Sequence, residues 1–257
     1  MHVSIKKGMW GGKTTAIWKG HPRQVPEPVV LTDEGISPSP ARRALDLAVA
    51  VAILALVWPL FLLLAMATRL STGGTAIYRQ RRVGQGGIPF TLYKFRSMRP
   101  TTEGPEVTAP GDDRVTRFGA IMRKTSLDEL PQMLNVLLGH MTLVGPRPES
   151  VALAARYPEG LRYVFRYRPG VTGPCQVLVR DEKVLGWALD VENFYLTKLL
   201  PHRIDMDMSF LKDPTLARTV RWLVITFLYL VRTAQPDLGT AQPEFAGATA
   251  LSGKTDD

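Results

Sequence analysis

Cysteine and histidine are scarce in this sequence. Cys175 is the only cysteine among 257 residues, and the four histidines are scattered. One cysteine forms no intrachain disulfide and no Cys-based metal site, and isolated histidines argue against a zinc site. Acidic residues are also in the minority, because 23 acids face 32 bases and the formal net charge is +9. This excess predicts an anionic partner: nucleic acid, acidic lipid or a phosphorylated substrate.

Both ends of the chain lack a sustained apolar period. Residues 1–40 end in alternating serine and proline, and residues 235–257 are polar and contain glycine. Segments of this composition bury too little apolar surface to offset the entropy of ordering. Both are therefore predicted to be disordered tails.

The one long apolar run extends from Ala44 to Leu70 and contains only two charged residues, Asp46 and Arg69. A membrane span needs about 20 apolar residues, so the run predicts a membrane-embedded segment. Pro59 lies near its middle, where it removes a helical hydrogen bond. Basic residues flank both ends, so the positive-inside rule gives no preferred direction. From these residues alone, a kinked span and a re-entrant hairpin that bends at Pro59 both remain open.

The next segment predicts a β-hairpin. Residues 76–83 and 89–98 have strand character, and a glycine-rich turn separates them. Alternation along the second strand places Lys94 and Arg96 on one face. These cations either bind an anion or form an ordinary solvated strand face.

Two adjacent carboxylates, Asp128 and Glu129, follow a basic segment that includes Arg123. One interpretation is structural. With Asp128 as the N-cap, Pro131 falls among the first N–H groups, which have no partner, and an apolar helix continues to Gly139. The other interpretation is chemical, because two carboxylates among cations form a typical site for an anionic substrate. These residues by themselves favour the structural interpretation.

Arg147 stands between two prolines, Pro146 and Pro148. The prolines restrict the local backbone, so the guanidinium is held in place as few surface arginines are. Near the C-terminus, Trp222 to Val231 forms an apolar run of ten residues between arginines, too short to span a bilayer. It predicts either a helix in the membrane interface or a core helix that packs on the globular domain.

Six motifs follow the proline-interrupted run in a fixed order: YRQRRVG, FTLYKFRSM, TRFG, SLDELPQMLNVLLG, LVGPRP and RPGVTG. Together they resemble the bacterial sugar transferase family, the monotopic phosphoglycosyl transferases that begin glycoconjugate assembly. The resemblance covers about residues 42–232, and the ordered set is more specific than any single motif. It indicates the short form of the family, because no bundle of additional membrane helices precedes the catalytic part.

The resemblance implies a reaction and a location. A phosphosugar passes from a UDP-sugar to a polyprenyl phosphate such as undecaprenyl phosphate, through an aspartyl-phosphosugar intermediate and with release of UMP. The product initiates exopolysaccharide, O-antigen or other lipopolysaccharide and glycoconjugate assembly. The implied cofactor is Mg²⁺. The implied location is the cytoplasmic face of the bacterial inner membrane, with a re-entrant helix that turns at Trp58-Pro59.

The resemblance also assigns residues. Asp128 matches the nucleophile and metal ligand, and Glu129 its helper and second metal ligand. Substrate contacts fall on the arginine before them, the basic strand and the Pro-Arg-Pro motif: Arg123, Lys94, Arg96, Pro146, Arg147 and Pro148. One departure is Pro174-Cys175 before Gln176, where many members have apolar or aromatic residues. It leaves the preference for sugar or acceptor open.

The predicted fold is α-dominant α+β, with a re-entrant membrane helix followed by a compact helical catalytic domain that contains a small β-hairpin. The expected organisation is a tail at 1–40, the membrane helix at 41–71, the catalytic domain with its interfacial C-terminal helix at 72–234, and a tail at 235–257. The alternative function is a non-catalytic, membrane-tethered adaptor or regulator of a polysaccharide pathway, which would need neither Asp128 nor magnesium. Nucleic acid is not an expected partner, because no basic helix or RNA-recognition aromatic signature occurs. The sugar, and whether the protein is a homo-oligomer, are left open.

Overall fold

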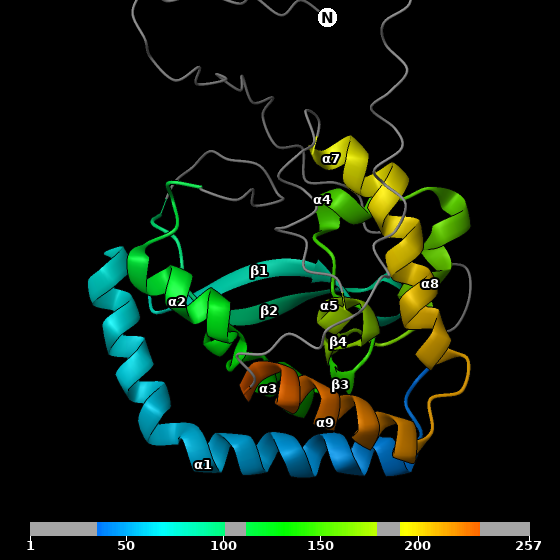
Figure 1. The fold of residues 1–257 in the computed structure, drawn as a ribbon, viewed down its shortest axis with the longest axis horizontal. Helices are drawn as coiled ribbons and strands as arrows, with labels where there is room; N and C mark the ends of the chain where they lie inside the picture. The colour runs from blue at the N-terminus through cyan, green and yellow to red at the C-terminus, as the bar shows by residue number, and fades with distance from the viewer. Residues whose placement is uncertain (1–34, 101–111, 179–190, 232–257) are drawn as a thin grey trace, which may run out of the picture.

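The computed structural model describes residues 35–100, 112–178 and 191–231. Helices dominate these residues, together with two small sheets of two strands each (Figure 1). The predicted α-dominant α+β class is therefore confirmed. Nearly all of the predicted N-terminal tail, the whole predicted C-terminal tail and most of the loop between residues 99 and 111 lie outside the described residues.

The apolar run forms one long helix, α1 (Pro40–Thr72), with Pro59 inside it. The Ser39 side chain accepts the backbone N–H of Arg42 at the helix start, and Gly73 ends the helix in the left-handed conformation. The helix is not straight. Its first part runs along one side of the molecule beside α9 (Leu216–Val231), and its second part turns sharply toward α2 (Arg117–Thr125) (Figure 1).

The first part of α1 is bound to the rest of the chain by polar contacts. Arg42 donates to the carbonyl oxygen of Val144 at 2.8 Å. Asp46 is fully buried and accepts the Thr142 hydroxyl at 2.7 Å and the Leu143 backbone N–H at 3.0 Å. The acid near the start of the apolar run therefore anchors α1 to Thr142 and Leu143, which no local pattern indicated.

The second part of α1 contacts the same domain. The rings of Phe61 and Phe95 are 4.7 Å apart, and the hydroxyls of Ser71 and Thr116 are 2.9 Å apart. Elsewhere along α1, large apolar side chains are exposed: Val51, Leu56, Trp58, Leu60, Leu62, Leu63 and Met66. By length and composition α1 is the one helix among the described residues that could cross a membrane, and only 11% of its most apolar window is buried. So long an exposed apolar surface marks a membrane protein.

The predicted β-hairpin is confirmed. Strands β1 (Ile77–Val83) and β2 (Pro89–Phe95) pair antiparallel, with Tyr78 opposite Lys94. The turn between them holds the short 3₁₀ helix η1 (Gln85–Gly87). Phe90 and Leu92 are buried in one core cluster, whereas Phe95, on the opposite face of β2, packs with Leu64 and Met122 in another.

The predicted capping role of Asp128 is wrong. Helix α2 is capped by Thr116, whose side chain accepts the Gly119 N–H, and it ends at Ser126 with a positive φ of 57°. The carboxylates follow in a separate 3₁₀ turn, η2 (Leu127–Glu129), and helix α3 (Gln132–Leu137) begins after Pro131 with no side-chain cap. The 3₁₀ turn and Pro131 separate Asp128 from the start of α3, so its carboxylate does not cap that helix.

A second, parallel pair of strands lies behind this turn. β3 (Thr142–Val144) pairs with β4 (Gly170–Thr172). The two strands approach closely at two glycines, because a Cβ on Gly170 would lie 2.1 Å from the Gly145 nitrogen. Along the chain, α4 (Val151–Ala154) and η3 (Glu159–Arg166) connect β3 to β4.

The remaining helices complete two sides of the core. They are α5 (Pro174–Leu178), α7 (Val191–Phe194), the π-helical segment η4 (Tyr195–Leu199), α8 (Leu200–Leu211) and α9. Helix α9 begins six residues before the predicted apolar run and combines both interpretations of it. Trp222 and Leu223 pack against the core, whereas Val224, Phe227 and Val231 are exposed.

Candidate active site

Asp128 lies in the η2 turn with only 7% of its surface exposed. Burial raises the pKa of the Asp128 carboxyl, while the positive charges of Lys94, Arg123 and Arg147 act in the opposite direction. The structure thus brings together residues from β2, α2, the η2 turn and the Pro-Arg-Pro segment. A desolvated carboxylate among cations is suited to meeting an anionic substrate, since the cations reduce the repulsion.

Glu129 lines a small cavity next to this cluster. Burial raises the pKa of Glu129, and the neighbouring Asp128 raises it further, against Arg147, Lys94 and Arg82. The cavity is lined by Arg82, Leu92, Lys94, Glu129, Gln132, Arg147, Pro148, Gly170, Val171 and Gln176. One acid and several cations thus share a small space, which favours a ligand with several oxygen acceptors.

The two cations of the β2 strand have different surroundings. Burial and the charge of Arg82 lower the pKa of Lys94 to about 8, although Asp128 counteracts this. Arg96 instead donates to the Thr75 carbonyl oxygen at 3.0 Å and to the Thr75 hydroxyl at 2.9 Å. Both cations lie over the Tyr78 ring, as their shared strand face predicts. Lys94 lines the cavity and Arg96 does not.

The Pro-Arg-Pro segment is held by backbone contacts on both sides. The Pro146 carbonyl oxygen accepts the Gly170 N–H at 2.8 Å, and the Pro148 carbonyl oxygen accepts from Arg82 at 3.2 Å. The backbone N–H of Arg147 donates to the Asp207 carboxyl. These contacts confirm that Arg147 sits on a restrained backbone, and they come from three other parts of the chain.

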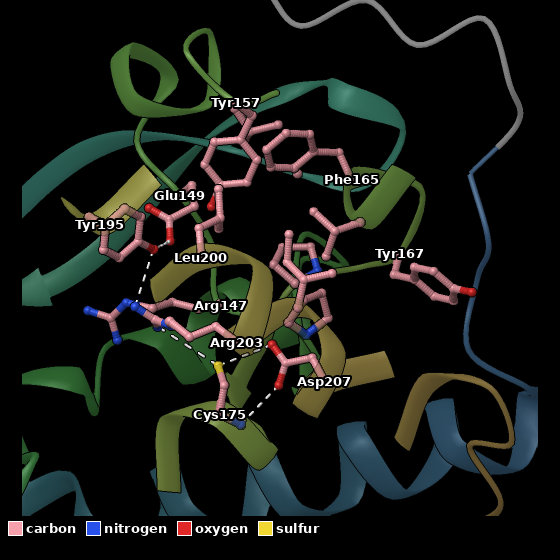
Figure 2. Close-up of a pocket in the computed structure, with 16 residues that line it drawn as sticks. Arg147, Glu149, Tyr157, Phe165, Tyr167, Cys175, Tyr195, Leu200, Arg203 and Asp207 are labelled. Carbon is pink, nitrogen blue, oxygen red and sulfur yellow. Dashed lines mark hydrogen bonds between the residues drawn. The ribbon is translucent and has the colours of Figure 1, made fainter. Parts of the chain in front are cut away.

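A buried polar network lies behind this segment (Figure 2). Tyr195 donates to Glu149 at 2.6 Å, and Arg203 donates to the Tyr195 oxygen at 3.2 Å. Arg203 also approaches the Cys175 sulfur at 3.8 Å. Cys175 donates to Asp207 through its backbone N–H at 3.0 Å and its thiol at 3.1 Å. Burial raises the pKa of the Cys175 thiol above its usual range, so this cysteine is packed and unreactive.

Sequence reasoning missed Arg82 and Gln176 as cavity residues and did not predict the buried network. Arg82 is the last arginine of the YRQRRVG motif, so the motif marked it, but nothing distinguished it from Arg79 and Arg81. The sequence marks Gln176 only by its position after the unusual Pro174-Cys175 pair. Its place in the cavity depends on contacts between α5 and α8, which a sequence pattern does not reveal.

The donor set fits the implied Mg²⁺. Asp128 and Glu129 are adjacent carboxylates with raised pKa values, and a nearby cation would offset their desolvation. Among the described residues no group of three or more His, Cys, Asp or Glu side chains could hold a metal by itself. Mg²⁺ binds in proteins through one or two carboxylates plus substrate phosphates, so a pair suffices when the substrate supplies oxygens.

The fold and site together define a membrane-associated protein with a cation-lined carboxylate site that is suited to an anionic ligand. The sequence matches the bacterial sugar transferase family over residues 38–233. The chain belongs to the bacterial sugar transferase family, as its motifs predicted. The expectation that it is an enzyme is therefore confirmed at the level of the family.

Named relatives agree on the kind of reaction. A UDP-glucose:undecaprenyl-phosphate glucose-1-phosphate transferase of Caulobacter vibrioides is 42% identical over 200 residues, covering 75% of this chain and 70% of that protein. An Escherichia coli protein of the same name is 37% identical over 67% of this chain and 36% of its own length. A UDP-N-acetylgalactosamine-undecaprenyl-phosphate N-acetylgalactosaminephosphotransferase of Aeromonas hydrophila is 35% identical over 77% of this chain and 44% of its own. The chain thus spans less than half the length of the last two relatives.

Proposed function

We propose that this protein transfers a phosphosugar from a UDP-sugar to undecaprenyl phosphate or a similar polyprenyl phosphate and releases UMP. The observation that carries the proposal is the buried Asp128 carboxylate with Lys94, Arg123 and Arg147 around it. The reaction named for the relatives supports it. The product would initiate exopolysaccharide, O-antigen or related glycoconjugate assembly.

In the proposed first step, an Asp128 oxygen attacks the phosphorus that carries the sugar. The bond from this phosphorus to the bridging oxygen breaks, and UMP leaves with the electron pair. In the second step, a phosphate oxygen of the polyprenyl phosphate attacks the same phosphorus. The aspartyl bond breaks, the carboxylate is restored and a polyprenyl diphosphate sugar forms. The covalent intermediate lets two bulky substrates react one after the other.

Asp128 suits the nucleophile better than Glu129 does. Neighbours in a 3₁₀ turn project about 120° apart, so only one of them faces the phosphorus in line. The positive charge of Arg123 lowers the pKa of the Asp128 carboxyl, whereas Glu129 lines the adjacent cavity with Arg82 and Gln132. Lys94 and Arg147 stand near both acids and would bind the phosphate oxygens.

Asp128 and Glu129 would hold Mg²⁺. When bound, the ion would neutralise charge on the diphosphate oxygens. The protein's own part is to keep Arg147 on a fixed backbone and to exclude water through the burial of Asp128. Arg96 would act at the margin, on the same strand face as Lys94.

The arrangement of α1 supports a re-entrant membrane segment. Both of its parts contact one catalytic domain, so in this proposal both ends would lie on the same side of a bilayer. The basic flanks on both sides favour the cytoplasm as that side. The exposed apolar residues of α9 would lie in the interface and bring the site to the headgroup plane, where a lipid phosphate is found. The proposed organisation is a membrane helix at 41–71 and a catalytic domain at 72–234.

The proposal is tested by intact-mass analysis of the purified protein incubated with a panel of UDP-sugars and Mg²⁺, without lipid acceptor. We expect UMP release and a phosphosugar adduct that peptide mapping places on Asp128. Asp128→Asn should abolish adduct and turnover together, whereas Glu129→Gln should slow both and leave the attachment site unchanged. Lys124→Gln, on the exposed end of α2, is the matched control and should leave the adduct intact.

Other results would overturn parts of the proposal. An adduct on Glu129, or UMP release only when acceptor is present, would refute the assignment of Asp128. No UMP release with any UDP-sugar would refute the enzymatic function and favour the membrane-tethered adaptor.

A further inference from the structure

The cavity beside Glu129 contains a polar group that the proposed chemistry has not yet used. The side-chain nitrogen of Gln176 is buried and has no hydrogen-bond partner among the described residues. It shares the cavity with Arg82, Lys94 and Arg147. A buried amide without a partner is costly, so such a group in a functional cavity points to a ligand that satisfies it.

The contacts of the neighbouring residues on α5 hold the Gln176 side chain toward the cavity. Its neighbours on α5, Cys175 and Val177, are 1% and 6% exposed, so the two flanking residues face the core. The Cys175 N–H and thiol both donate to Asp207. Asp207 also accepts the backbone N–H of Arg147. Figure 2 shows the Asp207 carboxyl bonded to Cys175. Through its two partners this one buried carboxyl connects α5 to the Pro-Arg-Pro segment and holds the backbone of Gln176 relative to Arg147.

The chemistry of the cavity indicates what the amide meets. Apart from Glu129, its charged residues are cations, so the ligand presents anionic oxygens. An amide N–H adds a directed hydrogen bond without adding charge, and bonds to charged acceptors are stronger than bonds between neutral groups. Because Gln176 is fixed to Arg147, the acceptor belongs to the same substrate that Arg147 binds.

We propose that Gln176 binds the diphosphate of the UDP-sugar by donating a hydrogen bond to a phosphoryl oxygen. This inference rests on the proposed function and adds a substrate-binding residue to it. Gln176 satisfies its amide only when the donor substrate is present. The lipid acceptor does not use this contact.

The test compares Gln176→Met, which keeps the length of the side chain and removes its hydrogen bonds, with wild type and with Gln85→Met. Gln85 is the matched control, because its amide bonds Ser37 and Arg168 and lies outside the cavity. Steady-state UMP release should show a loss of about 10- to 100-fold in kcat/KM for the UDP-sugar in Gln176→Met, the usual size for one hydrogen bond to a charged group. The KM for the polyprenyl phosphate should stay the same.

Two further measurements separate binding from folding. Inhibition by UDP should weaken in Gln176→Met, while inhibition by uridine should not change. The unfolding midpoint without substrate should be equal to or higher than that of wild type, since the substitution removes an unsatisfied buried amide.

The inference is overturned if kcat/KM for the UDP-sugar is unchanged while wild type is active, a result that leaves the proposed function standing. It also fails if the loss falls on the KM for the lipid phosphate, or if the variant unfolds at a lower temperature and loses activity in proportion. A wild-type protein that releases no UMP from any UDP-sugar would overturn both the proposed function and this inference.

Discussion

Replacing Asp46 by alanine should loosen the first part of α1 from the catalytic domain. The Asp46 carboxylate is 0% exposed and accepts two hydrogen bonds, from the Thr142 hydroxyl and the Leu143 N–H. Removing it leaves two buried donors without an acceptor, at about 1–3 kcal/mol each. We therefore expect the free energy of unfolding to fall by about 2–6 kcal/mol, a large share of the stability of a typical domain.

A double-mutant cycle separates the contact from other effects. Asp46→Ala, Thr142→Val and the double variant would be unfolded by denaturant in detergent micelles. The coupling energy between the two positions should be about 1–3 kcal/mol, because the hydroxyl and the carboxylate bond each other. Leu56→Ala, at a side chain 82% exposed on the same helix, is the control and should leave the catalytic domain's stability nearly unchanged.

Cysteine labelling, in wild type and in Asp46→Ala, tests the arrangement of the membrane helix. Cysteines introduced at Ser39 and Ser71, one at each end of α1, should both be labelled from the same side of the membrane. The native Cys175 is buried and should not react with the label. In Asp46→Ala the Ser39 end should become more accessible and the transferase slower. Unchanged stability together with labels on opposite faces would refute the reasoning, because α1 would then span the bilayer and Asp46 would not contact β3.

Two further predictions concern the donor site. Arg147→Ala should raise the KM for the UDP-sugar about 10-fold or more without releasing the protein from membranes, because a guanidinium on a restrained backbone is lost. The exposed Arg117→Ala is its control, and equal kinetics in both variants would reduce the Pro-Arg-Pro motif to a turn. The second is a pH dependence of stability, since burial raises the pKa of Asp207 from 3.8 to about 6. A raised carboxyl pKa means that ionisation costs stability, so wild type should lose stability relative to Asp207→Asn as the pH rises from about 4 to about 6, with no further change above about 7. Denaturant titrations across this range measure the difference, and a difference that grows in favour of wild type with rising pH would show that the folded state lowers this pKa.

Local patterns predicted much of the fold. The membrane-embedded run, the β-hairpin and the end of α3 near Gly139 follow from apolar periodicity, glycine and proline. These signals act over a few residues and need no partner far away in the chain. The capping role of Asp128 was wrong, because the acids fall in a separate 3₁₀ turn after the left-handed Ser126, a break that the spacing of acids does not reveal.

The sequence by itself determined the family, the apolar run and the candidate residues, because ordered motifs and hydrophobicity are properties of the chain. Only the tertiary structure decided which of these residues meet. Asp46 contacts Thr142 across 96 residues, and Lys94, Arg123 and Arg147 surround Asp128 from separate elements. It also placed Gln176 in the cavity. The neighbouring Cys175 is held there by Asp207, which lies 32 residues further along the chain from Cys175. Contacts of this kind depend on the packing of whole helices, and that packing balances many weak interactions at once.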